Sequence, residues 1–174
     1  MIYKLHFIVS SNAILQYLAD KYGKDDKLYP KDLRIRAIVN HRLCFNLSTY
    51  YRYISEHVMA PIFFAYERTP LSMKKTHIAL SVFNKYLSNT GTKYAACDHL
   101  TIADFQLITA TMCLEAIDFD ISNYPLVLKW YKTFKEEYSE LWEIAAVGMK
   151  EISEFEKNPP DLSHMDHPIH PVRK

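Results

Sequence analysis

The sequence predicts an all-α protein, a single bundle of amphipathic helices, and three observations indicate this fold class. Apolar residues recur at spacings of three and four over long stretches, which is the pattern of helices with one buried face. Only three of the 174 residues are glycine, too few for a series of tight hairpins. Hydrophobic residues make up 49% of the chain, enough to bury one sizeable core.

The first predicted helix covers residues 11–22, with Ser11 as its N-cap candidate and Gly23 at its C-terminal end. A polar segment, residues 24–31, follows it. A second helix is predicted from Asp32 to Met59, where Pro61 ends it. Its apolar face repeats at spacings of four and three: Ile35, Val39, Leu43, Leu47, Tyr50, Ile54 and Val58.

The third predicted helix begins at Thr69-Pro70, a cap residue followed by the proline that suits a first helical position, and ends at Gly91. Two more helices are predicted near the C-terminus. One opens at Pro125, and the other covers residues 141–155. Residues 158–174 contain four of the eight prolines and are predicted to be irregular.

The strongest local signal is the segment LTIADF. Thr101 can cap the amide of Asp104 while the Asp104 carboxylate accepts from the Thr101 amide, and Leu100 and Phe105 can close over this capping box. No charged residue occurs between Asp104 and Glu115, so the helix that follows is expected to be central and buried. On the sequence alone, Asp104→Ala is expected to cost ~1 to 2 kcal/mol of stability, because a cap bond and a buried helix start are lost together.

Composition argues against several classes of function. The formal charge is +1, so no large positive field exists for direct nucleic-acid binding. No run of about 20 apolar residues predicts a membrane span. The three cysteines have no CxxC spacing and suggest a reducing, cytoplasmic location. Cys44 and Cys113 are expected to be buried and Cys97 more exposed. The histidines of the tail alternate with prolines that forbid a helix, so no metal site is predicted.

The chain resembles cytosolic glutathione transferases of the insect delta and epsilon type. The segments YAA, LTIAD and YPLVLKWY resemble the C-terminal half of that family, and NHRLCFN is similar to its delta members. AILQYLADKYGKDDKLYPKD resembles the last helix of the family's thioredoxin-like domain and the linker after it. The resemblance, over about residues 10–155, implies four parts: a thioredoxin-like remnant (1–23), the linker (24–31), the helical domain (32–157) and a tail (158–174).

A second resemblance concerns the segments APIFF, KYAA and HPIHPVRK. They resemble the transferase-like region of insect FLYWCH zinc-finger proteins, and this relationship would allow a nuclear location.

The family resemblance implies glutathione as co-substrate. The family's Glu-Ser pair at the start of the helix reads Ser10-Ser11 here, so Ser11 is the matching glutathione contact. Three charged family positions are neutral, at Ser10, Asn12 and the residue after the RLxF motif, Asn46. The family's catalytic serine and cis-proline have no counterparts in this chain. Weak glutathione binding and no catalytic residue are therefore expected.

The resemblance also places an apolar co-substrate site on seven residues: Tyr51, Ile54, Met59, Ile62, Phe63, Met149 and Ile152. Such an aromatic and Met-rich stripe is equally consistent with plain core. Two functions follow from the sequence: a transferase that conjugates glutathione to apolar electrophiles in detoxification, inactive as this chain alone, or a non-catalytic module that forms a homodimer or docks another protein.

Overall fold

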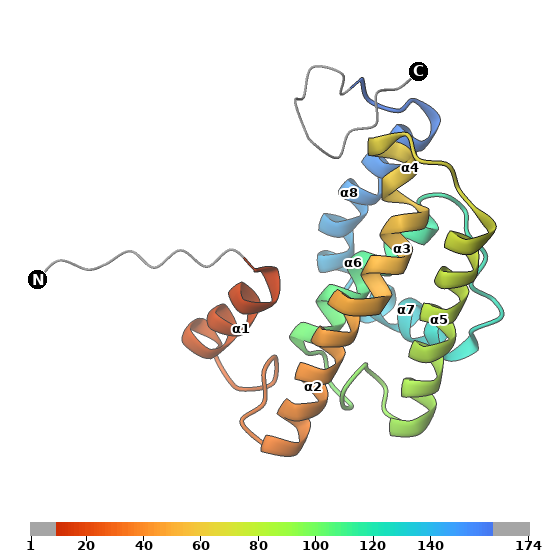
Figure 1. Cartoon of the computed structure of the whole chain (residues 1–174). Helices are drawn as coiled ribbons and strands as arrows, with labels where there is room; N and C mark the ends of the chain where they lie inside the picture. Colours follow the sequence, from red (N-terminus) through yellow and green to blue (C-terminus); the bar gives the residue numbers. More distant parts are fainter. Residues whose placement is uncertain (1–9, 162–174) are drawn as a thin grey trace, which may run out of the picture.

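The computed structural model describes residues 10–161, which form helices and the segments that connect them (Figure 1). The helices are α1 (Ser11–Tyr22), α2 (Leu33–Phe45), the π-helical turn η1 (Asn46–Tyr50), α3 (Tyr51–His57), α4 (Met59–Phe64), α5 (Pro70–Thr90), α6 (Ile102–Glu115), α7 (Pro125–Glu137) and α8 (Ser139–Lys157). The all-α prediction is confirmed. Residues 1–9 and the histidines at 164, 167 and 170 lie outside the described residues.

Helix α1 lies beside the bundle, next to α2 and α6 (Figure 1). Leu15 and Ala19 pack against a small buried cluster that includes Val39, Leu43 and Ala103. The N-cap position is Ser10, one residue before the predicted one. The spacing of the apolar residues therefore produces an amphipathic helix, but one whose other face remains exposed.

The second predicted helix, residues 32–59, is broken in the structure. After α2 the backbone forms the π-turn η1, then α3, and a further break at Val58 precedes α4. A π-turn inserts one extra residue and rotates the face that follows. Leu47, predicted to be buried, is consequently 63% exposed, while Asn46 and Tyr50 are buried. Pro61 does not end a helix; it lies in the first turn of α4, where its missing N–H removes no helical bond.

Helix α6 lies at the centre of the molecule, as predicted, and packs against α2, α3 and α8. Four aromatic rings from α2, η1, α5 and α7 form the core beside it. The ring centre of Phe83 is 4.9 Å from Trp130, 5.3 Å from Tyr50 and 6.4 Å from Phe45. The Tyr50 hydroxyl lies 2.9 Å from the Thr111 hydroxyl, and this hydrogen bond satisfies both polar groups within the core.

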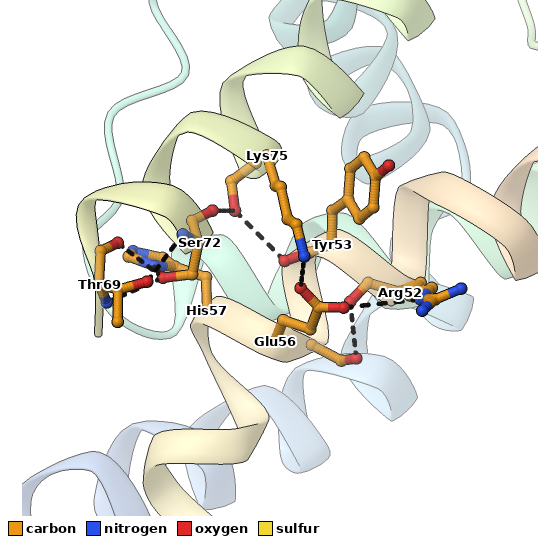
Figure 2. A network of polar contacts seen from close by, with 9 residues as sticks. Arg52, Tyr53, Glu56, His57, Thr69, Ser72 and Lys75 are labelled. Atoms are coloured by element: carbon orange, nitrogen blue, oxygen red, sulfur yellow. Dashed lines mark hydrogen bonds and ion pairs between the residues drawn. The ribbon is translucent and has the colours of Figure 1, made fainter. Parts of the chain in front are cut away.

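A polar network joins α3 to the start of α5 (Figure 2). The Thr69 amide donates to Ser72 Oγ at 3.1 Å, and this oxygen lies 2.9 Å from Nδ1 of the buried His57 imidazole. Nearby, Lys75 Nζ donates to Glu56 at 2.6 Å. Burial, with a smaller effect of the Arg68 charge, lowers the pKa of His57, so the folded protein holds this imidazole neutral.

This burial predicts a loss of stability in acid. The unfolded chain binds a proton on His57 near its ordinary pKa of about 6.5, and the folded chain binds it only at lower pH. The contribution of the neutral His57 to stability is therefore complete above the unfolded-state pKa, and it is lost as the pH falls through the folded-state pKa. We expect the urea midpoint to fall between about pH 7 and about pH 5 by more in the wild type than in His57→Asn. Equal falls in both proteins would contradict this prediction.

Candidate functional site

The start of α1 is the first part of the candidate site. Ser10, at the N-cap position, makes no side-chain cap bond within the described chain, and Ser10 and Ser11 are exposed. The first amides of this 12-residue helix therefore take no cap bond from the described side chains and carry the positive end of the helix dipole. Such an end attracts a carboxylate or phosphate group.

Two asparagines lie beside that helix start. Asn12 Nδ2 donates to the carbonyl oxygen of Leu43 at 3.2 Å, and the backbone N–H of Asn46, at the end of α2, donates to the same oxygen and to that of Arg42. The side chain of Asn46 is buried, and its Nδ2 donates weakly, at 3.5 Å, to Gln106 Oε1. Asn46 Oδ1 is buried and has no hydrogen-bond partner among residues 10–161. The structure thus places the Asn12 side chain at the end of α2, beside the backbone of Asn46, while the Asn46 side chain faces α6.

Gln106 is a site residue that the sequence did not single out. It is a half-buried polar residue of α6, and its side chain reaches Asn46, 60 positions away in the chain. Its one sequence signal is a long polar side chain in the uncharged stretch of α6 between Asp104 and Glu115.

The seven residues assigned to an apolar co-substrate fall into two groups. Ile54, Ile62 and Ile152 are 0%, 1% and 9% exposed, so other side chains cover them. Four retain exposed surface that a ligand could touch: Tyr51, Met59, Phe63 and Met149. The structure brings α4 and α8 together at this place, since the rings of Phe63 and Phe155 meet edge to face at 5.7 Å.

The burial of the three cysteines agrees with the prediction for Cys113 only. Cys113 is buried, and burial raises the pKa of its thiol to about 11, so it is not a ready nucleophile. Burial also raises the pKa of Cys97. The predictions for Cys44 and Cys97 were wrong: Cys44 is exposed and Cys97 is buried. Cys44 lies on the outer face of α2, and Cys97 lies in the loop before α6, where its Sγ is 3.4 Å from the carbonyl oxygen of His99.

Asp104 has a wider role than the capping box. Both halves of the predicted box are present, and the Thr101 amide donates to Asp104 Oδ2 at 2.9 Å. The Thr101 hydroxyl donates to the same oxygen, also at 2.9 Å. Oδ1 accepts from the Ala95 amide at 2.8 Å and from Trp130 Nε1 at 2.9 Å. The carboxyl group therefore ties the loop before α6 to α7, and the capping box predicted from the sequence is only part of its role.

Burial raises the pKa of this carboxyl group, because the four donors oppose but do not cancel the loss of water. Arg42, itself buried, donates to the carbonyl oxygen of Ala95 at 2.9 Å and supplies a positive charge nearby. All the partners of Asp104 are structural groups, which indicates that it holds the fold together.

No group of three or more His, Cys, Asp or Glu side chains between residues 10 and 161 is placed to hold a metal ion. Within the same residues, no helix has the length and apolar character needed to cross a membrane.

Comparison with known proteins shows which family this helical chain is similar to. Residues 58–137 match the family model of the glutathione S-transferase C-terminal domain. A diazinon-metabolizing glutathione S-transferase of the silkworm, Bombyx mori, is 57% identical, with a TM-score of 0.78; the match covers 83% of this chain and 68% of that one. The chain belongs to the glutathione transferase family.

Two further transferase structures, one of the insect delta class and one of the epsilon class, are similar to this chain. A delta-class enzyme of Nilaparvata lugens is 32% identical with a TM-score of 0.81, and an epsilon-class enzyme of the housefly, Musca domestica, is 34% identical with a TM-score of 0.78. In each case the match covers 88% of this chain and 71% of the other. The similarity to these transferases therefore extends well beyond the domain model.

Proposed function

We propose that this chain provides the apolar-substrate side of a glutathione transferase and that, on its own, it does not accelerate conjugation of glutathione. The observation that carries the proposal is the neutral cluster at the start of α1, with the buried, unpaired Oδ1 of Asn46 among the described residues. Glutathione has an ammonium group beside its α-carboxylate. The family pattern sets acidic and basic side chains against these groups, and here Ser10, Asn12 and Asn46 stand in their places.

The loss of those charges weakens binding without abolishing it. Charge-assisted hydrogen bonds are worth ~1.5 to 3 kcal/mol each, about twice as much as neutral ones. The amides of the first turn of α1 and the Ser11 hydroxyl remain available to a carboxylate. We therefore propose a weak glutathione contact at Ser11. The apolar electrophile would lie against Tyr51, Met59, Phe63 and Met149.

A conjugation assay tests the first half of the proposal. The purified chain, mixed with glutathione and an electrophilic chloronitroarene, is expected to give the uncatalysed rate. Turnover that survives repurification would contradict the proposal, since it would require another group to ionise the thiol.

Retention on immobilised glutathione tests the second half. The double variant Ser10→Glu/Asn46→Asp restores the acidic groups and is expected to bind at least about tenfold more tightly than the wild type. The matched control Ser88→Glu/Asn158→Asp adds the same charges at exposed positions and is expected to bind like the wild type. Equal gains in both variants would show a general charge effect and would count against this site.

Two less specific features belong to the same proposal. We propose a cytoplasmic location and assembly as a homodimer or with another protein. A relationship to FLYWCH zinc-finger proteins would make a nuclear location the alternative, and imaging of the tagged full chain in insect cells distinguishes the two.

A non-catalytic interaction module is the second candidate function, because apolar side chains are exposed along α8. Leu141, Ile144 and Val147 recur every three residues and are 40%, 74% and 61% exposed. We expect the chain to self-associate at micromolar concentration in sedimentation, and Ile144→Glu/Val147→Glu to shift it toward monomer. Leu71→Glu, at an equally exposed position on α5, is the control. A wild-type monomer that binds no hydrophobic dye would exclude this function.

A further inference from the structure

An open pocket of about 710 Å³ lies between the end of α3, the first half of α5 and the loop that joins α6 to α7. Its walls include His57, Met73, His77 and Phe119, and Asp118 and Asp120 lie exposed at its rim. None of the residues assigned to glutathione or to the apolar electrophile lines it. The pocket is therefore separate from the proposed transferase site.

The hydrogen bonds of Ser72 determine which nitrogen of His57 carries its proton (Figure 2). Ser72 Oγ accepts from the Thr69 amide and lies 2.9 Å from both the Thr69 carbonyl oxygen and His57 Nδ1. The hydroxyl has one hydrogen, and a contact of 2.9 Å between two oxygens requires it. Ser72 therefore donates to Thr69, and His57 Nδ1–H donates to Ser72.

This assignment leaves His57 Nε2 as a bare acceptor. The side chain is 2% exposed, and Nε2 has no hydrogen-bond partner among the residues that the structure describes. Because His57 lines the pocket, a ligand that enters can supply the missing donor. A neutral, almost fully buried imidazole with one unsatisfied nitrogen favours a ligand that carries an N–H or O–H group.

The wall of the pocket beside His57 is aromatic and held in place. The ring of Phe119 meets the imidazole of His57 edge to face at 5.9 Å and lies 5.4 Å from that of His77. The Phe119 amide donates to the carbonyl oxygen of Leu114 at 3.0 Å, which fixes the loop to the end of α6. An apolar group of a ligand can therefore pack against this fixed aromatic ring.

The charges around the pocket select the kind of donor. Arg68, the cation that lines the pocket, is bound through both terminal nitrogens to the Glu156 carboxylate at 2.6 Å, so its charge is compensated. Asp118 and Asp120 then leave the rim with a net negative charge. A cation is attracted to this rim and an anion is repelled.

We propose that this pocket binds an apolar organic ammonium ion, which donates an N–H to His57 Nε2, places its charge near Asp118 and Asp120, and lays its apolar body against Phe119 and Met73. The binding does not depend on glutathione or on conjugation. It assigns the chain a second ligand class beside the electrophile of the transferase site.

The test is a titration of the full chain with 2-phenylethylammonium, followed by the imidazole nitrogen signals in NMR. We expect saturable binding in the millimolar range or tighter, with the signal of His57 Nε2 moving toward the value of a protonated nitrogen. The anion that carries the same phenylethyl group, 3-phenylpropionate, is expected not to bind. Asp118→Asn is expected to weaken binding about threefold, whereas Glu143→Gln, an exposed carboxylate on α8, leaves it unchanged.

Three results would overturn the proposal: no saturable shift, equal binding of the anion, or equal weakening by Asp118→Asn and Glu143→Gln. Glutathione is absent from the titration, so its outcome is independent of the resin and conjugation experiments. A chain that binds the ammonium ion without catalysis would support this pocket alone.

Discussion

Asp104→Ala is expected to lower the free energy of unfolding by about 3 to 5 kcal/mol, more than the ~1 to 2 kcal/mol expected from the loss of a helix cap. The substitution removes a buried acceptor from four donors, which come from Ala95, Trp130 and both the amide and the hydroxyl of Thr101. Buried donors left without a partner cost about 1 to 3 kcal/mol each, and water that enters the space offsets part of the sum. Urea unfolding measures the difference.

Asp32→Ala is the matched control for this prediction. The Asp32 carboxylate caps α2 by accepting from the amides of Arg34 and Ile35 at 3.0 and 2.9 Å, and the side chain is exposed. Its removal is expected to cost about 1 kcal/mol. If both variants lose the same stability, the bonds from Ala95 and Trp130 contribute nothing and Asp104 is a cap alone.

Phe83→Ala is expected to cost about 3 to 5 kcal/mol. The side chain is fully buried, and its ring contacts three others, those of Phe45, Tyr50 and Trp130. Truncation leaves a cavity that these rigid rings cannot fill, and it removes three ring-to-ring contacts. The measurement is again the urea midpoint, with an unchanged slope as the sign that the fold is retained.

Ile78→Ala on the same helix controls for changes in helix propensity. Ile78 is 43% exposed, and its truncation is expected to change stability by less than about 1 kcal/mol. A loss below about 2 kcal/mol in Phe83→Ala would mean that the core closes around the cavity, contrary to the packing described here.

The break between α2 and α4 shows where the sequence pattern stopped being sufficient. Apolar residues recur at spacings of three and four through residues 43–58, as they would in one continuous helix. Such spacing relates each residue only to its near neighbours, so it does not reveal a break. The π-turn η1 adds one residue and changes which side chains face inward, so that Asn46 is buried and Leu47 exposed. Contacts with α5 and α6 favour this arrangement, and no local spacing encodes them.

The sequence by itself determined the helices that depend on neighbouring residues: the capping box of α6, the Thr69-Pro70 start of α5 and the amphipathic α1, all governed by interactions over three or four positions. Only the tertiary structure decided what depends on distant ones. The Trp130 bond to Asp104 spans 26 positions and the Asn46 bond to Gln106 spans 60. A polar group becomes costly or reactive through what surrounds it in space, and that environment exists only once the helices have packed.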